Sequence, residues 1–172
     1  MTNMRLTGFA RWTVRLLFSL CAAACLTACF SSAKQKLPNL PFYQLDGSLH
    51  SLSDLKGKVT LINFWATSCQ TCVKDMPQIM AIHERFKARG LETLAIAMAY
   101  DPPAYVMQFA QTRQLPFRVA MDHGGDLAQG LGPVQGTPTI LVINKQGEVV
   151  QRVVGEPDFM ALQWLLSQLL AE

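Results

Sequence analysis

The feature that most constrains the fold of this chain is the stretch FWATSCQTCVKDMP, residues 64–77, which contains two cysteines two residues apart. The overlapping run VTLINFW (59–65) is almost entirely apolar and rich in β-branched residues, which predicts a buried central strand. From Cys72 to Arg89 apolar residues recur at roughly helical spacing, and Gly90 stops the pattern. The cysteine pair is therefore expected at the junction of a strand and a long helix, which Pro77 should kink.

The rest of the chain alternates between strand-like and helix-like patterns. Short alternating stretches around a turn at Asp46-Gly47 predict a β-hairpin within residues 41–58. This order, strand and helix in turn with a closing hairpin and helix, predicts an α/β fold with a mixed sheet flanked by helices. The remaining predictions are strands at 91–99 and 117–122, two strands within 137–154, helices at 102–114 and 157–170, and part helix, part loop at 123–136.

The N-terminus has the pattern of an export signal. Three arginines, Arg5, Arg11 and Arg15, precede an uncharged and largely apolar segment at residues 16–28. That segment is shorter than the roughly 20 apolar residues that cross a bilayer. We therefore expect a signal peptide over residues 1–28, a polar tether over 29–39 and a folded domain over 40–172.

The signal ends in LTAC, residues 26–29, which resembles the lipobox of bacterial lipoproteins. The resemblance implies that Cys29 is lipidated and becomes the first residue of the mature chain. The alternative is an ordinary cleavage site with an incidental cysteine. On the lipoprotein interpretation, the protein is extracytoplasmic, anchored through lipid at Cys29 to a bacterial membrane, and faces the periplasm. The choice between inner and outer membrane stays open.

Removal of the signal changes the cysteine count and the charge. Of five cysteines, Cys21 and Cys25 lie in the signal and Cys29 would carry the lipid, so the mature sequence keeps only Cys69 and Cys72. The three signal arginines account for the whole formal charge of +3, which leaves 12 basic residues against 12 acidic ones. Without a basic excess, no nucleic-acid partner is expected.

Three uses of the remaining cysteine pair compete. A zinc site usually needs four ligands, but the sequence has no second CxxC, and His50, His83 and His123 have no paired spacing. A purely structural disulfide is disfavoured because so small a loop removes little unfolded-state entropy. A redox centre fits best, since a helix N-terminus stabilises a thiolate. Cys69 is then the nucleophile, and Cys72, one turn deeper, resolves the mixed disulfide.

NFWATSCQTC, KDMP and GTPT (136–139) together resemble the thioredoxin-like thiol-disulfide oxidoreductases of the TlpA/ResA/CcmG type, which are exported and tethered to bacterial membranes. The resemblance covers residues 40–172 and includes the N-terminal hairpin and a strand-helix insert at 95–122. It implies a thioredoxin-like fold and a redox disulfide between Cys69 and Cys72. We expect no cofactor, and no metal because the sequence offers no further paired ligands.

The resemblance also assigns roles to residues around the cysteines. Pro138 is expected to be a cis-proline that packs against the disulfide and presents the backbone of Thr137 to substrate; the alternative is a simple proline at a strand start. Ser68 stands where many relatives have a second tryptophan, which leaves Trp65 as the main aromatic residue near the site and a candidate substrate contact.

Asp75 lies three residues after Cys72 and so on the same helical face, where it could exchange a proton with that thiol. Family members carry a glutamate there, so the shorter aspartate could need a water to reach the sulfur. The alternative is a first-turn acid that favours the helix dipole. Gln70-Thr71, between the cysteines, replaces commoner dipeptides and should alter the reduction potential.

The leading hypothesis is a lipid-anchored oxidoreductase that reduces disulfides in client proteins. The resemblance favours reduction over disulfide formation, suggests apocytochromes c or copper-site assembly proteins as clients, and implies a membrane electron donor. A rival hypothesis is a copper-binding, metallochaperone-like module that uses the two cysteines as soft ligands. Intact cysteines and the Thr-Pro pair argue against a third, a degenerate interaction domain.

Overall fold

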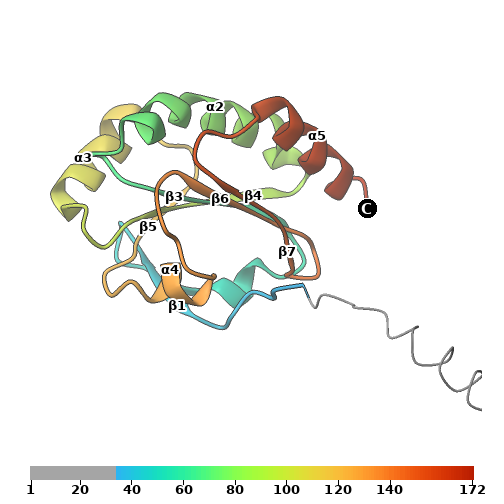
Figure 1. Cartoon of the computed structure of the whole chain (residues 1–172), viewed down its shortest axis with the longest axis horizontal. Helices are drawn as coiled ribbons and strands as arrows, with labels where there is room; N and C mark the ends of the chain where they lie inside the picture. Colours follow the sequence, from blue (N-terminus) through green and yellow to red (C-terminus); the bar gives the residue numbers. More distant parts are fainter. Residues whose placement is uncertain (1–33) are drawn as a thin grey trace, which may run out of the picture. The chain divides into compact units, whose positions relative to one another are not determined.

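The computed structural model describes residues 34–172, which fold as one unit (Figure 1). The predicted signal peptide and the predicted lipidation site at Cys29 lie outside the described residues. Within residues 34–172, no helix combines the length and the apolar character that a membrane span needs.

The centre of the domain is a mixed sheet of seven strands in the order β2-β1-β5-β4-β3-β6-β7. β3 pairs parallel with β4, and β4 with β5, whereas the other neighbouring pairs are antiparallel. The predicted mixed sheet and the predicted N-terminal hairpin are confirmed. The strands are β1 Pro41–Gln44, β2 Leu49–Ser51, β3 Val59–Trp65, β4 Leu91–Ala97, β5 Arg118–Met121, β6 Thr139–Ile143 and β7 Val149–Val154.

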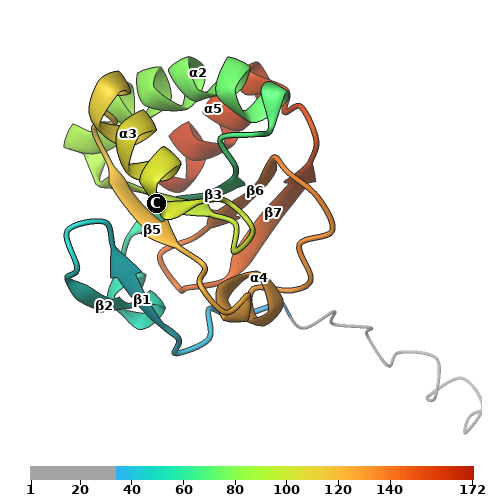
Figure 2. The same ribbon diagram turned by 90° about the vertical axis from the view of Figure 1, so that its left-hand side faces the viewer.

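Helices cover both faces of this sheet (Figures 1 and 2). On one face lie α2 (Gln70–Phe86, continued by the 3-10 turn η3, Lys87–Arg89), α3 (Pro103–Arg113) and α5 (Phe159–Leu169). On the other lie α4 (Asp126–Gly130) and the 3-10 helix η2 (Leu52–Leu55). This two-sided cover explains why the inner strands are apolar on both faces.

β3 is the buried central strand that the sequence predicts. All seven of its side chains are buried, and they alternate between two cores. Ile62 and Phe64 belong to the core that α4 and η2 cover, whereas Val59 and Leu61 belong to the core that α2 and α5 cover. Burial of each large apolar side chain contributes roughly 1.5–3 kcal/mol, so this strand fixes the register of its neighbours.

The folded body begins earlier than the predicted start at residue 40. Lys36 forms an antiparallel bridge with Glu148. The Leu37 N–H donates to the Gly147 carbonyl at 2.8 Å, and the side chain of Leu37 is only 6% exposed. We call residues 34–39 the docked segment: the second half of the predicted tether lies on the domain, because one leucine in a polar stretch finds an apolar site.

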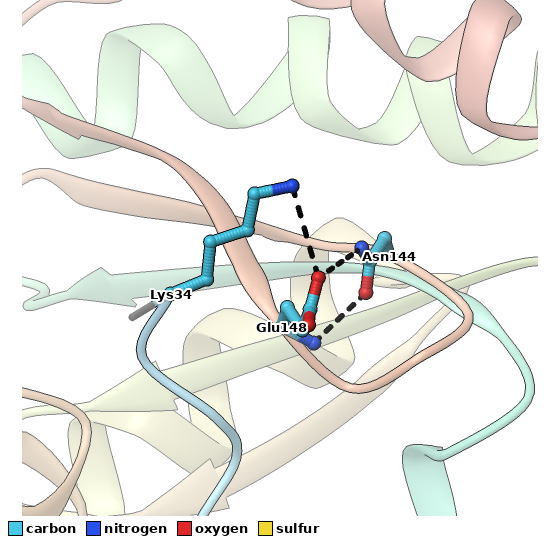
Figure 3. Close-up of polar contacts among 3 residues, drawn as sticks. All are labelled: Lys34, Asn144 and Glu148. Carbon is cyan, nitrogen blue, oxygen red and sulfur yellow. Dashed lines mark hydrogen bonds and ion pairs between the residues drawn. The ribbon is translucent and has the colours of Figure 1, made fainter. Parts of the chain in front are cut away.

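Side chains add a small polar cluster at this docking point (Figure 3). The Asn144 amide donates to Oε2 of Glu148 at 3.0 Å, and the Glu148 N–H donates to Oδ1 of Asn144 at 2.9 Å. The ammonium of Lys34 lies 3.8 Å from the same Oε2. Each polar side chain of the cluster therefore has a hydrogen-bond or ion-pair partner within the cluster.

The contact of Lys36 and Leu37 with Gly147 and Glu148 lies at the opposite end of the sheet from the cysteines. In the antiparallel pair of β3 and β6, Thr60 faces Ile143 and Phe64 faces Thr139. The turn after Ile143 that receives the docked segment is therefore beside the start of β3, whereas Cys69 follows its end. We call these two ends the tether pole and the redox pole; about 20 Å of extended strand separates them.

Candidate active site

Cys69 and Cys72 form a disulfide at the first turn of α2, with an S–S distance of 2.07 Å. Cys69 is the N-cap residue of α2, and its sulfur accepts a hydrogen bond from the Cys72 N–H at 3.2 Å. Cys69 is partly exposed, whereas Cys72 is 1% exposed. A sulfur that receives an amide N–H at a helix N-terminus is stabilised as a thiolate when the disulfide is reduced. The strand-to-helix location that the sequence predicts is confirmed.

Asp75 lies one turn further along α2, on its buried side, and is 3% exposed. Its Oδ2 has no hydrogen-bond partner among the described residues. Burial raises the pKa of the Asp75 carboxyl, and the charge of Glu156 raises it further, while Lys74 lowers it. Because α2 starts at Gln70, Asp75 lies beyond its first turn, and the alternative of a first-turn acid is wrong.

Trp65 closes the site from inside the domain. Its ring has no exposed area and lies 5.0 Å from the Phe109 ring, in one cluster with Cys72 and Met76. A side chain without exposed area does not meet a client at the surface, so the prediction of Trp65 as a substrate contact needs correction. Its packing supports Cys72 instead.

The Thr137–Pro138 peptide bond is cis, as the resemblance implies. Pro138 is buried and immediately precedes β6, whose Thr139 pairs with Phe64 of β3. The end of β3 is also where the cysteine loop starts, so the sheet register brings Pro138 to the redox pole. A contact between the Thr137 backbone and substrate stays a prediction.

Three further residues at this pole escape the sequence reasoning. Asp101, in the turn after β4, accepts two hydrogen bonds from Thr67, and Tyr100 beside it lies 3.3 Å, oxygen to oxygen, from the Thr137 hydroxyl. Asn63, on β3, is fully buried and neither polar atom of its amide has a partner among the described residues. A polar residue inside an apolar strand was the signal that could have identified Asn63.

No group of three or more histidine, cysteine, aspartate or glutamate side chains within residues 34–172 lies together as a metal site would require. The Thr71 hydroxyl lies 3.5 Å from the Cys69 sulfur. Three buried groups on β3 and α2 have polar atoms without a hydrogen-bond partner among the described residues: the Asp75 carboxyl, the Asn63 amide and the Trp65 indole N–H. Of these three groups, the Asp75 carboxyl is the one whose chemistry allows it to accept a proton from a thiol.

Residues 32–160 match the family model described as Redoxin. The thiol-disulfide oxidoreductase ResA of Bacillus thuringiensis subsp. konkukian is 33% identical over 135 residues, which cover 78% of this chain and 77% of the relative. A ResA of Bacillus cereus is 32% identical over 166 residues, which cover 91% of this chain and 94% of the relative.

Solved structures agree with these relatives. A candidate thioredoxin from Neisseria meningitidis superposes with a TM-score of 0.74 at 37% identity, covering 80% of this chain and 92% of that one. A candidate thiol:disulfide interchange protein DsbE from Chlorobium tepidum gives 0.71 at 30% identity, covering 80% and 96%. The fold is thioredoxin-like, and the chain belongs to the Redoxin family and, within it, to the ResA-type thiol-disulfide oxidoreductases.

Proposed function

We propose that this oxidoreductase reduces disulfides in client proteins outside the cytoplasm, with Cys69 as the attacking and Cys72 as the resolving cysteine. The observation that carries the proposal is the asymmetry of the pair: Cys69 is partly exposed and its sulfur receives the Cys72 N–H, whereas Cys72 is buried. An accessible, stabilised thiolate attacks clients, and a buried neighbour completes the reaction before a second client arrives.

The reaction then has two steps. The Cys69 thiolate attacks one sulfur of the client disulfide; an S–S bond to Cys69 forms, the client S–S bond breaks, and the other client sulfur leaves as a thiolate. Cys72 next loses its proton and attacks the Cys69 sulfur, which forms the Cys69–Cys72 disulfide and releases the client dithiol. Two electrons pass from the cysteine pair to the client, and a dithiol donor in the membrane restores them.

We assign the proton of Cys72 to Asp75. A buried carboxylate with a raised pKa binds a proton more readily than an exposed one, so it is better matched to a thiol. The unpartnered Oδ2 leaves a lone pair for that proton, taken directly or through a water.

Attachment to the membrane is proposed through lipid on Cys29. Four residues, 30–33, would then stand between the lipidated cysteine and the docked segment. The five residue steps from Cys29 to Lys34 span at most about 18 Å. Since the docked segment lies at the tether pole, such an anchor would direct the redox pole away from the bilayer and toward clients in the periplasm.

Clients and donor follow from the chemistry of the pair rather than from a pocket of defined shape. A client needs an accessible disulfide; apocytochromes c and copper-site assembly proteins are the classes that the family resemblance suggests. The donor needs a dithiol exposed on the same side of the membrane as the client.

Equilibration of the full chain, purified in mild detergent, in glutathione and dithiothreitol buffers tests the direction of electron flow. A potential near the roughly −270 mV of thioredoxin supports client reduction, whereas one near the roughly −120 mV of DsbA overturns it. The Cys69→Ser variant should lose insulin reduction completely, and Cys72→Ser should trap mixed disulfides. Stoichiometric Cu(I) binding that Cys69→Ser abolishes, without insulin turnover, would favour the copper-binding hypothesis.

A further inference from the structure

The turn between β4 and α3 contacts both loops that frame the disulfide. The Met98 N–H donates to the carbonyl of Trp65 at 3.0 Å, and the Asp101 N–H donates to the Met98 carbonyl at 2.9 Å. The hydroxyl oxygens of Tyr100 and Thr137 lie 3.3 Å apart. Met98–Asp101, which we call the brace turn, therefore links the end of β3 with the cis-proline loop.

The strongest contact of the brace turn is made by Asp101. The Thr67 N–H donates to Oδ2 and the Thr67 hydroxyl donates to Oδ1, both at 2.6 Å. Asp101 is 2% exposed, so the carboxylate that accepts both bonds is shielded from water, whereas Thr67 is partly exposed. Hydrogen bonds to a charged acceptor are the stronger kind, and two from one residue fix its orientation as well as its position.

An aspartate just before a helix would ordinarily cap that helix. Here the N-cap of α3 is Pro102 and the next residue is Pro103, and no side-chain cap bond forms. Neither proline has an N–H to offer. The two prolines therefore leave the Asp101 carboxylate available, and it turns to Thr67 on a different loop, 34 residues away in sequence.

Thr67 is two residues before Cys69, in a loop that the Cys69 N–H closes by donating to the Ala66 carbonyl at 3.1 Å. The position of Thr67 therefore determines where Cys69 meets the N-terminus of α2. Resting on the proposed role of Cys69 as nucleophile, we propose that Asp101 is a positioning residue for the Cys69 sulfur and acts through Thr67.

The side chains offer variants that separate geometry from charge. Asp101→Ala removes both bonds. Asp101→Asn removes the charge but keeps the link, because its oxygen accepts the Thr67 N–H while its NH₂ donates to the Thr67 hydroxyl oxygen. Thr67→Val removes the hydroxyl, and Thr67→Ser restores it.

The experiment uses the full chain in detergent, reduced, and measures the alkylation rate of Cys69 by iodoacetamide and the equilibrium constant with glutathione. We expect Asp101→Ala to slow alkylation about fivefold or more and to shift the equilibrium toward the disulfide by a similar factor, since a displaced thiolate loses its N–H. Asp101→Asn and Thr67→Ser should stay within about twofold of the wild type.

Asp122→Ala is the matched control. Asp122 is also 2% exposed and also accepts two hydrogen bonds, from the Leu127 and Ala128 N–H groups of α4, but it does not bond to the cysteine loop. This variant should lower the melting temperature without changing either thiol measurement. If Asp122→Ala changes them as much as Asp101→Ala does, the effect is general loosening and the proposal is wrong.

Two further outcomes would overturn the proposal. Equal effects of Asp101→Asn and Asp101→Ala would mean that the charge acts, not the position. Unchanged thiol chemistry in Asp101→Ala would mean that Asp101 is not needed to hold Thr67 in position. If Asp101→Ala does not fold, the same two thiol measurements on Thr67→Val and Thr67→Ser decide. Wild-type protein that fails to reduce insulin contradicts the proposed function instead, whatever the alkylation rates show.

Discussion

The two poles of the sheet differ in how many buried side-chain polar atoms lack a hydrogen-bond partner: among the described residues, Oγ1 of Thr60 is such an atom near the tether pole, and the others lie toward the redox pole. At the tether pole, Lys34, Asn144 and Glu148 form a cluster in which each side chain has a polar partner. Among residues 34–172, five buried side-chain polar atoms lack a hydrogen-bond partner, and four of them belong to Asn63, Trp65 and Asp75. These three residues lie in the last half of β3 or the first half of α2, toward the redox pole.

This difference indicates where the domain gives up stability for chemistry. A buried polar group without a partner costs about 1–3 kcal/mol, and most folds avoid it. A carboxyl that must take up and release a proton during catalysis needs an acceptor site that no permanent hydrogen bond occupies. The redox pole is therefore expected to respond to substitution mainly in rate, and the tether pole mainly in stability.

The largest expected effect is that of Asp75→Asn at the redox pole. An amide cannot accept the Cys72 proton, and general base catalysis is worth about 10²–10⁴ in rate, so resolution of the mixed disulfide should slow about 100-fold. Stopped-flow measurement of client release from a Cys69 mixed disulfide tests this. Asp75→Glu should retain most of the rate; a wild-type rate in Asp75→Asn would remove Asp75 from the mechanism.

At the tether pole, Leu37→Ala should lower the free energy of unfolding without slowing the reduction of insulin. Truncation of a buried leucine costs about 2–5 kcal/mol, and Leu37 packs in the core cluster that contains Ile62 and Phe64. Urea unfolding and insulin reduction measure the two quantities. Leu49→Ala, at a leucine that is 59% exposed, is the control and should change neither. Reduced activity in Leu37→Ala would mean that the poles are coupled.

The raised pKa of Asp75 also predicts a pH dependence of stability. The folded state holds this proton above the unfolded pKa of about 3.9, so the stabilisation that protonation gives is complete below that value and is lost as the pH rises through the raised pKa. Asp75→Asn should therefore be more stable than the wild type at neutral pH and equal to it in acid. Urea midpoints at several pH values test this, and a constant difference would contradict it.

The smallest effects are expected from the loss of two exposed ion pairs, one at the tether pole and one toward the redox pole. Lys34→Ala and Lys74→Ala each remove a surface pair, to Glu148 and Glu156, and should change the stability of the fold little, because solvent screens exposed ion pairs. They should differ in one respect: Lys74 lowers the pKa of Asp75, so its loss should raise that pKa further. Infrared titration of the Asp75 carboxyl distinguishes the two variants. A shift of the Asp75 pKa in Lys34→Ala would contradict this prediction.

Patterns of consecutive residues made most of the fold predictable. The run from Val59 to Trp65 and the apolar spacing of α2 identify the central strand and its helix, because burial imposes those periods directly. Isolated residues were less informative. Leu37 is one leucine in a polar stretch, and its burial depends on a core cluster with Phe42, Leu52 and Ile62, which the local sequence does not reveal.

The site was predictable where its residues lie close together in the sequence. The disulfide and the cis bond at Pro138 lie within motifs, whereas the contact of Asp101 with Thr67 joins residues 34 positions apart. Trp65 was misjudged because proximity in sequence to a reactive cysteine says nothing about which face of the strand a side chain occupies. Strand alternation, applied to the position, would have placed it under α2.

The docked segment also has a mechanical meaning. A pull on the chain at Lys34 acts first on the backbone bonds of Gln35 and Leu37 and then on the Leu37 side chain, which packs in one core cluster with Ile62 and Phe64 of β3. Releasing residues 34–39 would lengthen the free chain by up to about 20 Å. The tether of an anchored domain would thus lengthen under a pulling force and shorten again when Leu37 returns to its site.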